Sequence, residues 1–468
     1  MKHNYKTLGL KSGLEIHQQL DTHKLFCNCP SLLRQDKPLR EIKRTLNPVI
    51  GETGIVDIAV EHEAKQNKNF TYQVYDTNCL VETDEEPPHL INQEALKTAL
   101  QIAHLLNCKI FPTTQIMRKT VTDGSNTSGF QRTVLLAHDG HITISSGKKI
   151  AIDYLMLEED SARKATPNSE YPTPNNPIFK LDRLGIPLVE IATGPHMNTP
   201  EEIKEAALKL GEILRACKVK RGIGTIRQDV NISIKGSKRV EIKGFQDPKM
   251  MTKTIDLEIE RQIKCIKEKT CTNEVRNALP NGTTEFLRPM PGAARMYPET
   301  DHPLLKISRD LINETKRDLP KLQSENNSYL KEFGLNPELI KLILKKNKLE
   351  DFKTLIHEHN NPNLVAKMLT LFQTKPETSI HNIEEILEKI ENKEIPETDA
   401  KTIMQKISQG IPLKEAIKKS DIDLESETQK IIKQKPGLSQ GAYMGLLMGK
   451  FKGQISGKEI ADILKKLI

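Results

Sequence analysis

Two segments of this sequence alternate apolar and polar residues, and the alternation predicts β-strands with one buried and one polar face. The first, residues 13–20 (GLEIHQQL), puts leucine and isoleucine on one side and three polar side chains on the other: Glu15, His17 and Gln19. Lysine and threonine are suitable residues for a strand face that contacts only solvent. A carboxylate beside an imidazole instead suits metal binding and proton transfer.

The second segment, residues 224–247 (GTIRQDVNISIKGSKRVEIKGFQD), predicts an antiparallel hairpin. A two-residue turn would place an apolar residue opposite a carboxylate, so the apolar faces favour a three-residue loop over residues 236–238. This register pairs Ile232 with Ile242, Ser233 with Glu241, and Asn231 with Lys243. The polar face then carries Arg227, Asp229, Asn231, Ser233, Arg239, Glu241 and Lys243. An ordinary solvated sheet face is the alternative, and the short Asp and Asn side chains argue against it.

Two further segments supply groups of the same kind. Residues 155–164 (LMLEEDSARK) place three carboxylates where a strand should end: Glu158, Glu159 and Asp160. Residues 117–133 (MRKTVTDGSNTSGFQRT) place three cations around a loop rich in small polar residues: Arg118, Lys119 and Arg132. The backbone N–H groups of such a loop can bind phosphate. Carboxylates, an imidazole and cations together suit Mg²⁺ and phosphoryl transfer.

Several common motifs are absent from the sequence. It contains no GxxxxGK[ST] and no convincing GxGxxG at the start of a helix, so a nucleotide site must be of another kind. It also contains no obvious Cys/His nucleophile, so we expect no amidase centre. The seven cysteines are few and odd in number, which argues against a disulfide framework. The CNC of Cys27 and Cys29 lies far from Cys79 and Cys108, and this spacing does not match a zinc-binding pair of CxxC motifs.

The pattern of predicted secondary structure changes along the chain, and it predicts an α+β fold. Up to residue 307, short alternating strands mix with helices, one of which begins clearly at Thr199 as N-cap, with Pro200 at N1 and Glu202 closing a capping box. From residue 308 nearly everything is helical, and a small helical unit begins near residue 421. The sequence therefore predicts an α+β domain at 1–307, an all-helical domain at 308–420 and a tail domain at 421–468.

The charge of the chain is unevenly distributed. The formal net charge is +8, and lysines crowd the C-terminal third, which suits a polyanion partner. The alternative is that these lysines form only the solvated faces of helices. No run of eighteen apolar residues and no signal-peptide pattern occurs, so we expect a cytoplasmic protein.

Seven motifs in this order resemble the GatB/GatE family, and in particular the E subunit of archaeal glutamyl-tRNA(Gln) amidotransferase, a relative of the bacterial-type B subunit. They are GLEIHQQLDTHKLFCNCP, YDTNCLVETDEEPPH, VTDGSNTSGFQRT, LDRLGIPLVEIATGP, VKRGIGTIRQDVNISI, RVEIKGFQD and RPMPGAARMYPETD. The C-terminal GAYMGLLMGKFKGQISGKEIADIL resembles the small tail domain of the family. The residues in the motifs HQQLDT and GAARMYPETD favour the archaeal E type over the bacterial B type.

The resemblance implies an activity. Such a protein uses ATP and Mg²⁺ to phosphorylate the γ-carboxylate of glutamate mischarged on tRNA(Gln). Ammonia from a partner, the asparaginase-like D subunit (GatD), then displaces the phosphate and gives glutaminyl-tRNA(Gln). The resemblance also implies a heterotetramer of two D and two E subunits. Residues 1–307 would form the catalytic cradle domain, and the tail would bind tRNA.

Roles for individual residues also follow from the resemblance. The candidate magnesium ligands are Glu15, His17, Glu158 and Asp229. The candidate catalytic residues beside the glutamyl end and its acyl phosphate are Glu241, Lys243 and Asn231. The candidates for binding the phosphates of ATP are Lys119, Ser125, Gln131 and Arg183. The candidates for binding tRNA are Lys450, Lys452 and Lys458.

One departure from the family concerns an insertion that resembles a domain of aspartyl-tRNA synthetase. Here only TCTN, residues 270–273, separates the flanking helix and strand, so the insertion is absent or nearly so. Two other functions stay open. A catalytically inactive tRNA-binding scaffold should have lost Glu15, His17 or Glu241, which are present. A bacterial-type B subunit would have an amidase partner and could act on aspartyl-tRNA(Asn).

Overall fold

The computed structural model describes residues 3–46, 54, 56, 61, 65, 68–165, 176–245, 248–290, 296–417, 424–451 and 457–467. The chain divides into two compact units, Met1–Leu322 and Gln323–Ile468. The predicted change to an all-helical chain at residue 308 falls just before a helix that packs in the first unit. The predicted boundary at residues 420 and 421 lies outside the described residues.

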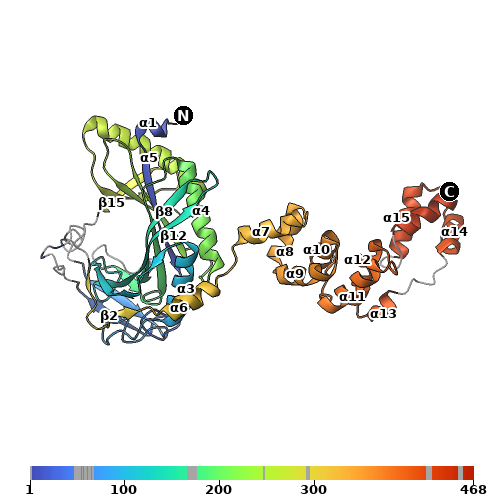
Figure 1. The fold of residues 1–468 in the computed structure, drawn as a ribbon, viewed down its shortest axis with the longest axis horizontal. Coiled ribbons are helices and arrows are strands. Elements are labelled where there is room, and N and C mark those ends of the chain that lie inside the picture. Colours follow the sequence, from blue (N-terminus) through green and yellow to red (C-terminus); the bar gives the residue numbers. More distant parts are fainter. Residues whose placement is uncertain are drawn as a thin grey trace. The chain divides into compact units, whose positions relative to one another are not determined.

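The first unit contains the strands and five of the described helices (Figure 1). Its strands are β1 (Lys11–Gln19), β2 (Arg40–Arg44), β3 (Phe70–Val74), β4 (Lys109–Ile110), β5 (Thr113–Thr114), β6 (Ile116–Thr120), β7 (Phe130–Thr143), β8 (Lys149–Glu159), β9 (Arg163–Lys164), β10 (Ile178–Lys180), β11 (Pro187–Thr193), β12 (Ile226–Ser233), β13 (Val240–Phe245), β14 (Glu274–Ala278), β15 (Thr284–Pro289), β16 (Met296–Pro298) and β17 (Leu305–Lys306). Its helices are α1 (Tyr5–Leu8), α3 (Gln93–Leu105), α4 (Pro200–Ala216), α5 (Pro248–Glu268) and α6 (Arg309–Arg317).

Most of these strands form one large sheet. Its order is β15-β14-β13-β12-β1-β11-β8-β7-β6-β16, with β4 paired to β7. The sheet is mixed because β13 and β14 run parallel, whereas β1 pairs antiparallel with both of its neighbours. A smaller sheet has the order β2-β3-β10-β9, and β17 pairs with β5. The α+β class expected from the sequence is confirmed.

The apolar face of the large sheet is buried by helices. Alternate side chains of β1, β11 and β12 form one core with α3, α4 and α5, and Figure 1 shows α4 and α5 along one side of the sheet. The start of α4 is as predicted, because Thr199 Oγ1 accepts a hydrogen bond from Glu202 N at 3.2 Å. The predicted capping box also requires the Glu202 carboxylate to accept a hydrogen bond from Thr199 N. This carboxylate instead accepts from Asn198 N. The apolar stripe of α4 is buried: Ala206, Ala207, Leu210, Ile213 and Leu214.

The predicted hairpin exists, but its predicted register was wrong by two residues. β12 and β13 pair Ile232 with Val240 and Asn231 with Glu241, so Ser233 does not face Glu241. The chain turns through Ser237 N donating to Ile234 O, with Gly236 at a φ of +89°. A slip of two residues keeps every side chain on its face, so the apolar pattern fixes only the parity of the register.

The second unit is entirely helical in its described parts, as the sequence predicts. Its helices are α7 (Gln323–Glu332), α8 (Pro337–Lys345), α9 (Leu349–Glu358), α10 (Pro362–Thr370), α11 (Ile380–Glu391), η1 (Glu397–Asp399), α12 (Ala400–Ser408), α13 (Leu413–Ala416), α14 (Leu424–Gln434), α15 (Gln440–Lys450) and α16 (Gly457–Leu467). They form two separate hydrophobic cores, one from α7 to α13 and one from α14 to α16. Among the described helices, none has the length and apolar character needed to cross a membrane.

Candidate active site

A large pocket lies over the polar face of the large sheet. Its volume is about 1210 Å³, which exceeds the 300–1,000 Å³ of most small-molecule pockets. Eleven residues that the sequence singled out for metal, phosphate or catalysis all line it: Glu15, His17, Lys119, Ser125, Gln131, Glu158, Arg183, Asp229, Asn231, Glu241 and Lys243. The structure thus brings together groups that are up to 228 residues apart, while the role of each stays a prediction.

The strand order explains why these groups meet. β1 lies between β12 and β11, and its register places Glu15 beside Asp229 and His17 beside both Arg227 and Glu190. Every second side chain of these strands points to the same face, so neighbouring strands place polar groups in adjacent rows. The result is a patch of carboxylates around one imidazole.

Two groups of side chains in this patch could hold a metal ion. The potential ligand atoms of Glu15, His17 and Asp229 lie within 4.8 Å of one another. The same is true of His17, Glu158 and Glu190. Carboxylate oxygens with an imidazole fit a hard divalent cation such as Mg²⁺. All four predicted ligands belong to one of the two groups.

Glu190 is a member of this patch that reasoning from the sequence missed. Its carboxylate lies 3.3 Å from His17 Nε2 and 3.2 Å from Lys119 Nζ, and it accepts a hydrogen bond from Tyr154 Oη at 3.0 Å. Its side chain is only 4% exposed. A single carboxylate inside the apolar run PLVEIAT was the available signal, because a buried charge is costly unless it is paired.

The crowding of carboxylates shifts their proton affinities. Burial and the nearby charge of Glu190 raise the pKa of Glu158 to about 7 and also raise the pKa of Glu15. Burial alone would lower the pKa of His17, but the hydrogen bond to Glu190 and the charges of Glu190 and Glu15 raise it overall. A divalent cation would relieve this repulsion.

Lys119 and Gln131 both donate hydrogen bonds to Glu158 in the patch. Lys119 Nζ lies 2.6 Å from Glu158 Oε1, and Gln131 Nε2 donates to Glu158 Oε2 at 2.7 Å. Both residues come from the paired strands β6 and β7. The loop between these strands contributes Ser125, whose hydroxyl donates to Asp123 at 2.6 Å. Lys119 and Gln131 are therefore held by the candidate metal ligands.

A second cluster lies on β12 and β13. Lys243 Nζ lies 2.7 Å from Asp229 Oδ2 and 2.5 Å from Glu241 Oε1. Burial would lower the pKa of Lys243, but the charges of Asp229 and Glu241 raise it overall, so this lysine is a cation. Asn231 faces Glu241 across the two strands. The cluster therefore offers a charged donor, a carboxylate and an amide beside the metal patch.

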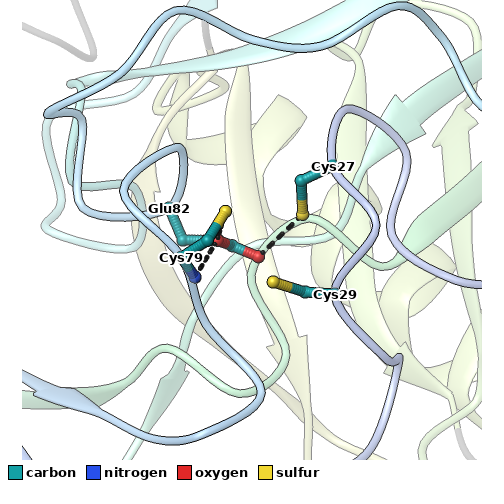
Figure 2. Close-up of side chains that lie close together, drawn as sticks. All are labelled: Cys27, Cys29, Cys79 and Glu82. Atoms are coloured by element: carbon teal, nitrogen blue, oxygen red, sulfur yellow. Dashed lines mark hydrogen bonds between the residues drawn. The ribbon is translucent and has the colours of Figure 1, made fainter.

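Outside this pocket, four side chains from two loops form another candidate metal site. Figure 2 shows Cys27, Cys29, Cys79 and Glu82 pointing toward one another, and their potential ligand atoms lie within 4.8 Å of one another. Cys27 Sγ and Cys79 Sγ donate to Glu82 at 3.2 and 3.1 Å, and Lys24 Nζ lies 2.6 Å from the same carboxylate.

Three thiols and a carboxylate are donors that suit zinc. The spacing in the sequence did not indicate this cluster, because the loop after β3 brings Cys79 to the CNC pair. Cys108 is not part of this cluster. All seven cysteines are free thiols.

The predicted tRNA-binding lysines are described only in part. Lys450 is half exposed at the end of α15, and its Nζ lies 2.6 Å from Glu427. Lys452 lies outside the described residues, and so does the side chain of Lys458.

The fold and the pocket define an α+β protein with a wide pocket on one face of a mixed sheet. Carboxylates, an imidazole and cations line this pocket, as they line the sites of metal-dependent enzymes. The model of the GatB/GatE catalytic domain matches residues 10–313. The E subunit of glutamyl-tRNA(Gln) amidotransferase from Methanocaldococcus jannaschii is 35% identical over 100% of this chain and 99% of its own length. The corresponding proteins of Methanococcus vannielii and Saccharolobus solfataricus are 33% and 31% identical over at least 98% of both chains. The chain belongs to the GatB/GatE family.

The length of the alignments also bears on the missing insertion. The alignment with the M. jannaschii protein runs over 638 positions, many more than the 468 residues of this chain. The relative therefore contains segments that this chain lacks. Here α5 ends at Glu268 and β14 begins at Glu274.

Proposed function

We propose that this chain phosphorylates Glu-tRNA(Gln) with ATP and then amidates it with ammonia supplied by a partner, giving Gln-tRNA(Gln). The observation that carries this proposal is the pocket in which carboxylates, an imidazole, lysines and arginines meet. The names of the full-length relatives support the substrate. An inactive scaffold would not need to keep every one of these costly buried charges.

The proposed chemistry proceeds in two steps. The γ-carboxylate oxygen of glutamate attacks the γ-phosphorus of ATP, which forms an acyl phosphate and releases ADP. Ammonia then attacks the carbonyl carbon, the bond to the phosphate oxygen breaks, and a base takes a proton from the nitrogen. Activation is needed because the oxygen of a free carboxylate is a poor leaving group.

The residues of the metal patch would hold Mg²⁺. The donors of Glu15, His17, Glu158, Glu190 and Asp229 fit this ion. When bound, Mg²⁺ neutralises charge on the transferring phosphoryl group. Lys119, Ser125, Gln131 and Arg183 would bind the phosphates of ATP from the same pocket wall.

The cluster on β12 and β13 would act on the glutamyl end. Lys243 donates hydrogen bonds and supplies positive charge where the acyl phosphate forms. Glu241 is the nearest carboxylate to accept a proton from the attacking ammonia, and Asn231 orients the substrate by its amide. All three side chains come from paired strands, which fix their spacing.

The partner and the assembly are proposed from the resemblance to the family. The sequence has no obvious Cys/His nucleophile to release ammonia from an amide. Its one GxSxG match, GLSQG at 437–441, uses Ser439 as the N-cap of α15. An asparaginase-like D subunit would therefore supply the ammonia. We propose two D and two E subunits per complex, working in the cytoplasm. The tail, with Lys450, Lys452 and Lys458, would bind the tRNA.

Release of ADP tests the first step. The purified chain is mixed with Mg²⁺, ATP and Glu-tRNA(Gln), and ADP is measured with uncharged tRNA(Gln) as the control. We expect ADP only with the glutamylated tRNA. A folded protein that releases no ADP above the control would contradict the proposal.

The nitrogen source tests the second step. Ammonium chloride should support formation of Gln-tRNA(Gln) by the chain alone, whereas glutamine or asparagine should not. Addition of an asparaginase-like partner should restore the use of the amide donor. Amidation from glutamine by the pure chain would show that it has an amidase centre of its own.

A further inference from the structure

At one end of the pocket two arginines share a single buried carboxylate. Arg227 Nη2 lies 2.9 Å from Asp160 Oδ1, and Arg183 Nε lies 3.7 Å from Asp160 Oδ2. The Asp160 side chain is 2% exposed, and it also accepts hydrogen bonds from Gln19 Nε2 at 2.6 Å and Ser161 N at 2.8 Å. The carboxylate oxygens thus accept hydrogen bonds from three donors and form a longer ion pair with Arg183.

The positive charge at this end is not balanced by protein groups. Among the described residues, neither arginine forms an ion pair with a second carboxylate, and the nearby Arg163 is paired with Asp182 instead. Burial lowers the pKa of Arg183, and the charge of Arg227 lowers it further against the attraction of Asp160. Two guanidinium groups therefore face the pocket with one negative charge between them.

The arginines are held in place before any ligand arrives. Arg183 donates from Nε to Ser161 O at 2.7 Å and from Nη2 to Ala162 O at 3.0 Å. Arg227 is fixed by its ion pair and by the pairing of β12 with β1, which sets it beside His17. A ligand at these arginines therefore lies next to the metal patch.

The surroundings suit a phosphate group. Guanidinium groups bind phosphate oxygens with two parallel N–H donors. The pocket wall here also includes Ser125, Ser161 and two glycines, Gly222 and Gly224. A Cβ at either glycine would meet nothing within 4 Å, so the wall is open to a ligand at both positions.

We propose that Arg183 and Arg227 form a phosphate subsite, and that Asp160 sets the spacing of the two guanidinium groups. The phosphate belongs either to the polyphosphate tail of ATP or to the last phosphodiester of the aminoacylated RNA. The inference deepens the proposed function, because it adds Arg227 and Asp160 to the groups that bind its substrates.

Binding of nucleotides without turnover tests the subsite. Calorimetry measures the affinity of the full chain for ATP, for inorganic tripolyphosphate and for adenosine, and filter binding measures its affinity for Glu-tRNA(Gln). Loss of one charged hydrogen bond costs about 1.5–3 kcal/mol, which is roughly a 10–100-fold loss of affinity. We expect the affinity of Arg227→Gln to fall by that factor either for ATP and tripolyphosphate or for Glu-tRNA(Gln), and its affinity for adenosine to stay unchanged.

The two sources of phosphate give different results. Weaker binding of ATP and tripolyphosphate with unchanged tRNA binding assigns the subsite to the nucleotide, and the reverse assigns it to the RNA. Arg227→Lys keeps a positive charge beside Asp160 but loses the two parallel N–H donors of the guanidinium group. Its affinity for the phosphate ligand should therefore lie between that of the wild type and that of Arg227→Gln. Arg239→Gln is the matched control, because Arg239 lines the same pocket beside β13.

Unchanged affinity of a folded Arg227→Gln for all three phosphate ligands would overturn the subsite. Equal losses in the Arg239→Gln control would also overturn it, because they would show a general effect of charge. The proposed function fails separately, if the wild-type chain releases no ADP with Glu-tRNA(Gln). In that case binding through Arg227 could still be measured.

Discussion

Glu241 is the side chain whose change best separates chemistry from folding. Its carboxylate contacts Lys243 at 2.5 Å in the pocket and faces Asn231 across the sheet. Glu241→Gln keeps the size and one oxygen for Lys243, but it removes the negative charge and the proton acceptor. We expect a folded protein whose ATP-dependent amidation is slower by about 10²-fold or more. Formation of Gln-tRNA(Gln) measures the rate, and circular dichroism checks the fold.

The matched control for this change is Glu285→Gln on β15. Glu285 is exposed and does not line the pocket, so the same chemical change there should leave the rate unaltered. If folded Glu241→Gln kept more than about a tenth of the wild-type rate, Glu241 would have no part in proton transfer.

Binding of Mg²⁺ should depend on pH through Glu158. Its pKa is raised to about 7, so the folded protein keeps a proton that the unfolded chain has lost above pH 4.5. This group therefore stabilises the fold below that pH, and the contribution is lost as the pH rises toward 7. Mg²⁺ needs the ionised carboxylate, so its apparent affinity should fall about tenfold per pH unit below 7 and level off above it. Calorimetric titrations at pH 6, 7 and 8 measure this.

Glu158→Gln serves as the control for the pH effect. It keeps the shape of the side chain but removes the titrating group, so the remaining affinity for Mg²⁺ should change less between pH 6 and 7. Equal Mg²⁺ affinity of the wild-type protein at pH 6 and pH 8 would remove Glu158 from the set of metal ligands.

Single residues also show what the sequence alone could predict of the site. Glu15, His17 and Asp229 stand out because they alternate with apolar residues on strands with a clear pattern. Glu190 does not, because β11 lies between β1 and β8 and is mostly apolar on both faces. The lone carboxylate in this apolar run was a signal of a buried charge, but only the strand order placed it beside His17.

At the scale of elements, the short strand β16 is tied to the sheet by a buried carboxylate that follows it. Glu299 accepts hydrogen bonds from Arg118 Nη2 at 2.5 Å and from Arg132 Nε at 2.8 Å, and its side chain is fully buried. Glu299→Gln would remove the buried carboxylate that the two guanidinium groups share, leaving Arg118 with the more exposed Asp301 and Arg132 with Glu159 at 3.4 Å. We expect the free energy of unfolding of the first unit to fall by roughly 3–5 kcal/mol. Denaturant unfolding followed by tyrosine fluorescence measures it.

Asp301→Asn is the control for this ion-pair network. Asp301 contacts the same Arg118 at 3.2 Å, but its side chain is 47% exposed. An exposed ion pair contributes about 0–1 kcal/mol, so this change should have little effect. Equal effects of the two variants would show that burial of Glu299 does not govern the stability of this strand.

The elements were largely predictable from the sequence, but their pairing was not. Period-2 alternation predicted β1, β12 and β13, and the N-cap predicted the start of α4. The register of β12 against β13 was off by two residues because alternation carries no information beyond parity. The cluster of Cys27, Cys29, Cys79 and Glu82 was also missed, because two separate loops bring its members together.

At the scale of the whole molecule, this chain is shorter than the relatives that it matches along its full length. The M. jannaschii protein has segments without a counterpart here, and α5 connects to β14 through five residues, 269–273. Any contact with tRNA that such an insertion supplies in the relatives is then missing from this chain. We therefore expect binding of tRNA to depend more on the second unit.

The small core of α14, α15 and α16 is the part of the second unit that we expect to bind tRNA. This core is separate from the core of α7 to α13, so a chain ending after Ser420 should keep the other helices folded. Truncation there should weaken binding of Glu-tRNA(Gln) and leave binding of Mg²⁺-ATP unchanged. Each lost phosphate contact should reduce the slope of log affinity against log salt by somewhat less than one. Filter binding across a salt series measures both quantities.

Point variants in the intact chain separate contact with tRNA from a change in folding. Lys450 is already paired with Glu427 at 2.6 Å, whereas Lys433 and Lys435 are exposed and form no ion pair among the described residues. A phosphate must displace Glu427 to reach Lys450, so Lys450→Gln should change the salt slope less than the double change Lys433→Gln and Lys435→Gln. If the truncated chain and the double variant both bind tRNA with the wild-type affinity and slope, these lysines form only a solvated face, and the tail has no part in binding tRNA.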